Sequence, residues 1–168
     1  MSSAVHPVLH PVIIYVEDNQ GDAILLQEAL QERAPDVSLV VIEDGAKALH
    51  YFQIKAQVRD IPPPHCILLD THLPIVTGLQ LLAFIRTAES YNDTPVYIFA
   101  DEVDYRTVTE AVRVSKESFL IKPSAWPGYL ELADLLMKSS KAKAEGRAAD
   151  PADDQPEVHP KGALRLDP

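Results

Sequence analysis

The chain has 168 residues, and 25 acidic against 15 basic side chains give it a formal net charge of -10. Such a negative surface repels nucleic-acid phosphates and anionic lipid heads, so we expect neither nucleic acid nor a membrane surface as a partner. The single cysteine excludes an intramolecular disulfide, and no apolar run approaches the roughly 20 residues that span a bilayer, which predicts a cytoplasmic protein.

Five apolar, largely β-branched runs alternate with helical patterns along the chain. The runs are predicted to be strands at Val12–Val16, Val37–Ile42, Cys66–Leu69, Val96–Phe99 and Phe119–Ile121. Continuous apolar runs are typical of strands covered on both faces, as in a parallel sheet. Helices are predicted at Asp22–Arg33, at Gly45–Lys55, at Gly78–Thr87, along a stripe through Tyr105, Val108, Ala111 and Val112, and from near Pro127 onward. This alternation predicts an α/β fold with a doubly wound, five-stranded parallel sheet and five helices.

The chain divides into one folded domain and two flanking segments. We assign residues 11–140 to the domain and residues 1–10 to a flexible N-terminal segment. Residues 141–168 contain no aromatic residue, so they cannot bury enough surface on their own to offset the entropy of ordering them. They are interpreted as a tail that is flexible or docks on a partner.

Charged residues follow the predicted strands where ligands bind in open α/β sheets, outside the carboxyl ends of the strands. Glu17 and Asp18 follow the first strand, Asp70 the third and Lys122 the fifth. In the strand order 2-1-3-4-5 the first and third strands are neighbours, so three carboxylates meet in one cleft and repel each other unless a cation intervenes. Mg²⁺ prefers oxygen ligands and keeps water positions open for phosphate oxygens. The sequence therefore predicts a site that receives an anion through a metal.

Three segments in this order resemble the receiver domains of two-component response regulators: VIIYVEDNQGDAILLQEAL, ILLDTHLPIVTGLQLL and FLIKP. The resemblance covers about Pro11–Ser140 and implies the flavodoxin-like receiver fold. It implies a stand-alone response regulator, a phosphoacceptor signalling protein rather than an enzyme, that is phosphorylated by a histidine kinase. The E-D-N opening and the stretch RDIPPPHCILLDTHLP further resemble the stand-alone receivers associated with bacteriophytochrome histidine kinases.

The resemblance also implies roles for individual residues of the cleft. Asp70 is expected to accept the phosphoryl group. Asp18 and Asp70 would hold Mg²⁺, with Glu17 acting directly or through water and the backbone carbonyl of His72 completing the protein ligands. Lys122 would contact the phosphoryl oxygens.

One of the two residues that would report phosphorylation departs from the family pattern. Receivers usually carry Thr or Ser at the end of the fourth strand, where this chain has Ala100. Without that hydroxyl we expect phosphorylation to be coupled only weakly to conformation, a muted switch. Phe119 matches the aromatic switch position, although a half-buried strand aromatic is an equal interpretation. Pro123 is expected to fix the turn after Lys122 through a cis peptide.

Other functions remain open at this stage. A degenerate receiver could act as a phosphorylation-independent interaction module. Ala100, at the position where receivers usually have Thr or Ser, is consistent with that alternative. Glu17 and Asp18 could serve as dipole partners of the helix that follows them. Phosphatases of the haloacid dehalogenase type also use an aspartate nucleophile with Mg²⁺, but they need a second Asp two residues further on, where this chain has His72.

The last predicted helix carries apolar residues on more than one side: Tyr129, Leu130, Leu132, Ala133, Leu135, Leu136 and Met137. One narrow core stripe needs fewer. Similar receivers dimerise through the fourth helix, fifth strand and fifth helix, so we expect a homodimer through that face. A long final helix that faces the core is the alternative.

Overall fold

The five predicted strands form one parallel sheet in the order β2-β1-β3-β4-β5. The structure is a computed structural model that describes residues 10–58, 61–104, 108 and 118–146. Its strands are β1 (Val12–Val16), β2 (Ser38–Ile42), β3 (Cys66–Asp70), β4 (Val96–Ala100) and β5 (Phe119–Ile121). The predicted fold class and strand order are confirmed. β3 and β4 each run one residue further than predicted, so that Asp70 and Ala100 are the last residues of their strands.

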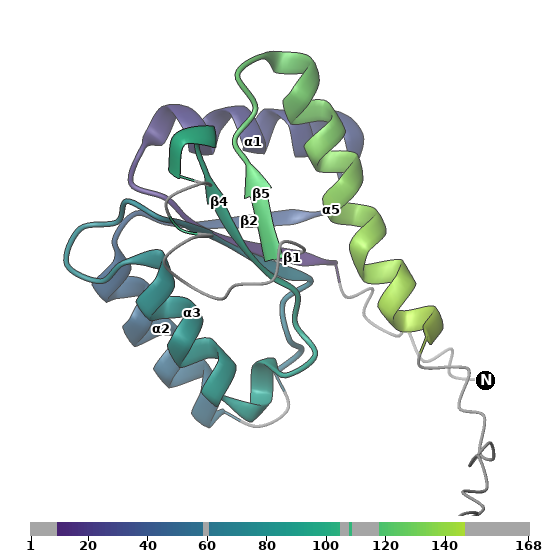
Figure 1. The fold of residues 1–168 in the computed structure, drawn as a ribbon. Coiled ribbons are helices and arrows are strands. Elements are labelled where there is room, and N and C mark those ends of the chain that lie inside the picture. The colour runs from purple at the N-terminus through teal and green to yellow at the C-terminus, as the bar shows by residue number, and fades with distance from the viewer. Residues whose placement is uncertain (1–9, 59–60, 105–107, 109–117, 147–168) are drawn as a thin grey trace, which may run out of the picture.

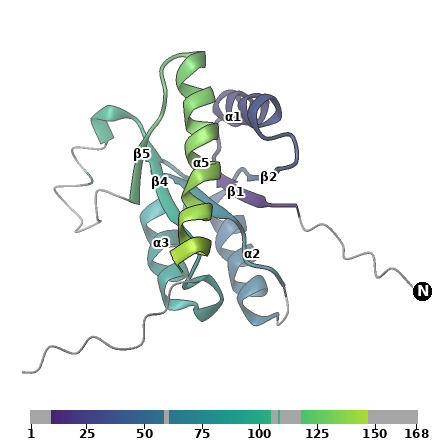
Figure 2. The ribbon, with the colours of Figure 1, turned by 90° about the vertical axis from the view of Figure 1, so that its right-hand side faces the viewer.

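Helices cover both faces of the sheet: α1 (Gln20–Arg33) and α5 (Trp126–Gly146) lie on one face, and α2 (Gly45–Gln57) and α3 (Gly78–Thr87) on the other (Figures 1 and 2). A short 3-10 helix, η1, follows α3 at Glu89–Tyr91. The fourth predicted helix falls mostly outside the described residues. In that region the structure describes only residues 102–104 and 108, and they are helical. α5 extends beyond Ser140, where the sequence analysis ended the domain. Within the described part of the chain, no helix has the length and apolar character needed to cross a membrane.

The sheet separates two apolar layers. Alternate residues of β1 point to opposite faces, as the strand period requires: Ile13 and Tyr15 pack with α1 and α5, and Ile14 and Val16 pack with α2 and α3. All five residues of β3, the central strand, are buried. Because these strands are buried on both faces, their sequences are continuous apolar runs.

Polar caps fix where three helices begin. The Asn19 Oδ1 accepts hydrogen bonds from the backbone of Gly21 at the start of α1, and the Asp44 Oδ1 accepts them from the backbone of Ala46 at the start of α2, at 2.9 and 2.7 Å. Thr77 and Gln80 form a reciprocal capping box at the start of α3. Since each helix begins just after a strand has ended, these caps set the shape of the loops at the carboxyl edge of the sheet.

Candidate functional site

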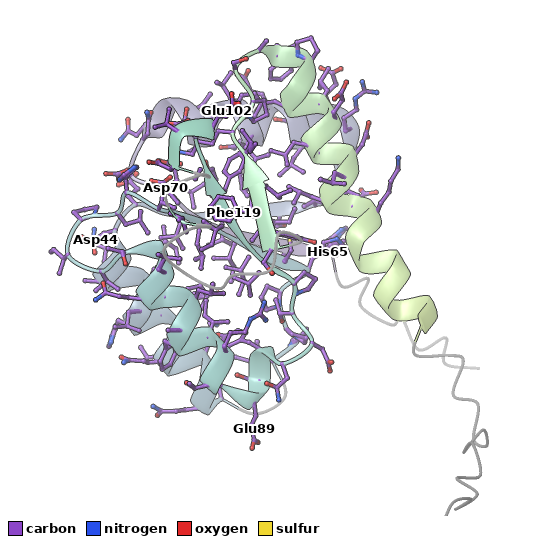
Figure 3. The ribbon with its side chains drawn as sticks, viewed as in Figure 1. Asp44, His65, Asp70, Glu89, Glu102 and Phe119 are labelled. Carbon is purple, nitrogen blue, oxygen red and sulfur yellow. The ribbon has the colours of Figure 1, made fainter. Side chains whose placement is uncertain are left out.

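Three carboxylates meet at the carboxyl edge of the sheet, as the strand order predicts. Glu17 follows β1 directly, Asp18 is the next residue, and Asp70 ends β3. One oxygen from each lies within 4.8 Å of the others. Glu17 and Asp70 are 1% and 4% exposed, whereas Asp18 is exposed to solvent. Figure 3 shows Asp70 at the end of its strand, on the side of the molecule where the loops gather.

Lys122 supplies positive charge to this cluster. Its backbone N–H donates to the carbonyl of Ala100 at 2.9 Å, which extends the pairing of β5 with β4 by one residue. Its Nζ lies 2.6 Å from the Glu17 Oε2 and 3.1 Å from the Asp70 Oδ1, and 2.9 Å from the Asp22 Oδ2 in the first turn of α1. Burial alone would lower the pKa of Lys122, but the hydrogen bonds to Glu17 and Asp22 outweigh it and raise the pKa above its ordinary value. The ammonium therefore stays charged.

Glu17 is held by several donors at once. Its Oε2 accepts from the hydroxyl of Tyr15 at 2.7 Å as well as from Lys122, and its Oε1 accepts from the backbone N–H of Asn19 at 3.0 Å. Burial raises the pKa of Glu17, and the three hydrogen bonds lower it again without cancelling the effect of burial. Burial and the neighbouring Glu17 charge raise the pKa of Tyr15, so the phenol remains a donor.

The backbone around Asp70 is fixed by the start of α3. A Cβ on Gly78 would lie 2.1 Å from the carbonyl oxygen of Asp70, a distance that no side chain can occupy. Gly78 is therefore required for this close approach of helix to strand. The Asp70 Oδ2 accepts from the backbone N–H of His72 at 3.1 Å. Both oxygens of Asp70 are thus oriented, one by the loop after β3 and the other by Lys122.

The three remaining residues singled out from the sequence lie below this cluster or beside it. Ala100 is fully buried and Phe119 is 7% exposed, both in the apolar layer between the sheet and α2 and α3. The Pro123 ring packs against Gly128 in the first turns of α5, where an added Cβ would come within 2.7 Å of it. The expected cis peptide before Pro123 is wrong, because the described residues contain no cis bond. Since the two isomers of an X-Pro bond differ by only about 0.5–1 kcal/mol, the sequence does not decide between them.

Sequence reasoning missed three residues that contact this site. Tyr15 lies two residues before Glu17, and the strand period of two could have placed both on one side of β1. Asp22 lies in the first turn of α1, four residues after Asp18, and this short separation could have indicated that both face the same site. Asp104 lies 2.6 Å from His72 through Oδ2 and Nε2 and 3.4 Å from the Thr71 hydroxyl. No signal in the sequence indicated that contact.

The donor set suits a hard divalent cation. The cluster of Glu17, Asp18 and Asp70 offers carboxylate oxygens, which are the ligands that Mg²⁺ and Mn²⁺ take in proteins. Lys122 contributes one positive charge to the carboxylates of Glu17, Asp22 and Asp70, and Asp18 adds a fourth carboxylate beside them. The site therefore retains negative charge that a cation would neutralise. The exposure of Asp18 leaves the cluster open to solvent on one side.

Comparisons with known proteins agree with this geometry. The family described as the response regulator receiver domain matches residues 13–132. The response regulator Rcp1 of Synechocystis sp. is 30% identical over 111 residues, which are 66% of this chain and 76% of Rcp1. The Arabidopsis thaliana two-component response regulator ARR15 is 27% identical over 152 residues, which are 88% of this chain and 71% of ARR15.

Solved structures of two response regulators have the same fold. The Mn²⁺-bound form of Rcp1 is 26% identical with a TM-score of 0.61, over 76% of this chain and 92% of that one. The bacteriophytochrome response regulator AtBRR is 25% identical with a TM-score of 0.61, over 77% of this chain and 94% of that one. Similarity in both sequence and structure therefore converges on one family.

Proposed function

Because the chain belongs to the family of response regulator receiver domains, we propose that it accepts a phosphoryl group on Asp70 from a histidine kinase. Members of this family are signalling proteins rather than classical enzymes. The observation that carries the proposal is the placement of Asp70, with Lys122 3.1 Å from one of its oxygens and the Glu17 and Asp18 carboxylates beside it. A carboxylate so placed can act as a nucleophile toward phosphorus.

The chemical step needs little more than positioning and charge. A carboxylate oxygen of Asp70 forms a bond to phosphorus, the phosphorus–nitrogen bond of the phosphohistidine breaks, and the departing imidazole keeps the electron pair and takes a proton from solvent. The Lys122 ammonium would stabilise the negative charge on the phosphoryl oxygens. The His72 N–H holds the second Asp70 oxygen and so fixes the direction of attack.

The site fits Mg²⁺ as the cofactor. Asp18 and Asp70 would bind it, Glu17 would act directly or through water, and the carbonyl of His72 would complete the protein ligands. When bound, the ion supplies positive charge that offsets repulsion between the carboxylates and an incoming phosphoryl group. Glu17 has three donors already, which favours contact through water.

The test is phosphorylation by a small donor. With Mg²⁺ and acetyl phosphate, wild-type protein is expected to gain the mass of one phosphoryl group, and Asp70→Asn none, because the amide cannot act as the nucleophile. Intact-mass spectrometry measures both, with Asp44→Asn as a control that removes the same charge from a helix cap that is not part of the cluster. An unmodified wild type, under conditions that label another receiver domain, would favour a phosphorylation-independent interaction module.

The kinase is proposed to be of the bacteriophytochrome type. Rcp1 and AtBRR are similar to this chain over most of its described length, and AtBRR is a bacteriophytochrome response regulator. A structure of the phosphorylated cyanobacterial phytochrome response regulator RcpA has the same fold, with a TM-score of 0.66. Phosphotransfer from a purified bacteriophytochrome kinase, compared with transfer from an unrelated histidine kinase, tests this assignment.

Ala100 favours a muted switch. Its methyl group is fully buried, and one hydrogen bond of about 1 kcal/mol would shift a two-state equilibrium about fivefold. Ala100→Thr is therefore expected to enlarge the change in amide hydrogen exchange across β4 and β5 on phosphorylation. Valine has the shape of threonine without the hydroxyl, so Ala100→Val should not enlarge this change in hydrogen exchange. Equal changes in both variants would count against a role for the missing hydroxyl.

A second copy of this chain is the proposed partner for the outer face of β5 and α5. Four of the apolar residues of α5 face the core and are buried: Tyr129, Leu132, Ala133 and Leu136. Leu135 and Ile121 remain 48% and 47% exposed. The fourth helix, which completes the expected dimer face, lies mostly outside the described residues.

Sedimentation velocity tests the dimer. Leu135→Lys is expected to weaken self-association by at least about tenfold, since burying a leucine contributes about 1.5–3 kcal/mol. Ile24→Lys, at a residue of α1 that is 53% exposed, is the matched control and should leave it unchanged. A wild-type monomer at tens of micromolar would contradict the dimer.

A further inference from the structure

Asp104 joins two loops that flank the phosphoacceptor. It lies in the helical turn 102–104, which follows β4. Its Oδ2 is 2.6 Å from the His72 Nε2 and 3.4 Å from the Thr71 hydroxyl. His72 and Thr71 belong to the loop that follows β3, directly after Asp70. The contact therefore ties the segment after β4 to the residues next to the reactive carboxylate.

His72 connects this contact to the site through its backbone. Its N–H donates to the Asp70 Oδ2 at 3.1 Å, while its side chain reaches Asp104. Any rotation of the Asp70 carboxylate changes the partner of this N–H, and a shift of the His72 backbone moves the imidazole that Asp104 holds. One residue thus meets the reactive group with its main chain and the neighbouring loop with its side chain.

Burial indicates that the contact serves position more than stability. The His72 side chain is 72% exposed and that of Asp104 is 21% exposed. An ion pair with one partner in solvent adds little to folding stability. The contacts of Asp104 with Thr71 and His72 nevertheless restrict the relative position of the two loops.

The same two loops lack the connection that a hydroxyl at the end of β4 would provide. Ala100, the last residue of β4, presents a buried methyl group. Asp104 lies four residues further along the chain and offers a carboxylate that already contacts the loop after β3. The acceptor lies on the loop after β4, and the donors lie beside Asp70.

We propose that Asp104 is a positioning residue that holds the loop carrying His72, and that the coupling remaining between the Asp70 site and residues 102–104 passes through this contact. The inference rests on the proposed function, because it concerns the loop whose carbonyl would complete the metal site. Asp104 touches neither the metal nor the phosphoryl group. It acts through His72.

The test compares Mn²⁺ affinity, measured by electron paramagnetic resonance of the free ion, in Asp104→Ala, which removes the accepting oxygen, and His72→Leu. Substituting a residue that orients a metal ligand typically weakens metal affinity about tenfold or more. Both variants are expected to weaken Mn²⁺ binding about tenfold, and the double variant no further, because either change breaks the same contact. His72→Gln keeps a donor of similar reach and should restore most of the affinity.

The direction in which His72→Leu changes Mn²⁺ affinity distinguishes a positioning role of the contact from a purely electrostatic effect. Removing the Asp104 carboxylate lowers the attraction for a cation in any case. Removing an imidazole, which is neutral or positive, would leave that attraction unchanged or strengthen it. Glu102→Gln removes one negative charge from an exposed residue of the same helical turn. It therefore shows how much Mn²⁺ affinity is lost through the change in charge alone. If only Asp104→Ala weakens binding, or if neither variant does, the proposal is wrong.

Amide hydrogen exchange in metal-free protein provides a second readout. Asp104→Ala is expected to speed exchange severalfold in residues 71–73, on the far side of the contact, and Glu102→Gln is expected to leave it unchanged. Unchanged exchange at residues 71–73 in Asp104→Ala would overturn the proposal. This comparison needs neither metal nor phosphate, so it still decides the role of Asp104 if wild-type protein binds no Mn²⁺, a result that would count against the proposed function.

Discussion

Replacing Lys122 with methionine is expected to lower the free energy of unfolding by about 3 kcal/mol at neutral pH. The Lys122 side chain is 11% exposed, and it contacts the nearly buried carboxylates of Glu17 and Asp70. Removing the cation leaves those charges without their partner in a medium of low polarity, which costs more than the ion pair itself contributes. Urea unfolding of the two proteins measures the difference.

The deficit of Lys122→Met should depend on pH. Burial already raises the pKa of Glu17, and loss of the Lys122 hydrogen bond raises it further. A carboxyl group whose pKa is higher in the folded state stabilises the fold at low pH, and this contribution is lost as the pH rises through the folded-state pKa. The difference between variant and wild type is therefore expected to grow as the pH rises above the ordinary glutamate pKa.

Lys138→Met is the matched control, since Lys138 is an exposed residue of α5. Exposed substitutions away from specific contacts change stability by about 0.5 kcal/mol or less. If Lys122→Met unfolds at the same urea concentration as Lys138→Met at neutral pH, then Lys122 does not hold the carboxylates together as its distances indicate.

Asp18→Asn is expected to weaken Mn²⁺ binding at least about tenfold. Two unit charges about 4 Å apart attract each other by about 4 kcal/mol in partly polar surroundings, and each 1.4 kcal/mol corresponds to about tenfold in affinity. Asp18 is exposed, so the substitution leaves the fold intact while it removes one of the three clustered carboxylates.

Asp44→Asn is the matched control for Asp18→Asn. It removes the same charge from a residue that caps α2, and asparagine caps a helix as well as aspartate does. Asp44 is not one of the three clustered carboxylates. Equal Mn²⁺ affinities in Asp18→Asn and Asp44→Asn, by paramagnetic resonance or calorimetry, would show that the cluster is not the metal site.

The main features of this fold follow from local patterns. Continuous apolar runs such as the one before Asp70 predict central parallel strands, because both faces of β3 are buried. The order of the strands then brings Glu17, Asp18 and Asp70 to one edge. The cluster could be predicted because its members each stand at a strand end, a position that the sequence marks clearly.

The contacts that connect distant segments could not be predicted in the same way. Asp22 and Lys122 are 100 residues apart in the chain and 2.9 Å apart in space. Their contact depends on where the start of α1 lies relative to the residue that follows β5, and the same sequence pattern would fit a solvated aspartate. Asp104 lies in a short helical turn and His72 in a loop, and neither segment is long enough for a sequence pattern to predict the direction of its side chains.

Borohydride reduction of the phosphorylated protein tests the central claim most directly, because it converts an aspartyl phosphate into homoserine at the residue that accepted the phosphoryl group. Wild-type protein treated with Mg²⁺ and acetyl phosphate is then digested and sequenced by tandem mass spectrometry. We expect homoserine at position 70 and aspartate at positions 18 and 22. Homoserine at another aspartate, or at none in protein that has gained phosphoryl mass, would contradict the assignment of Asp70 as the phosphoacceptor.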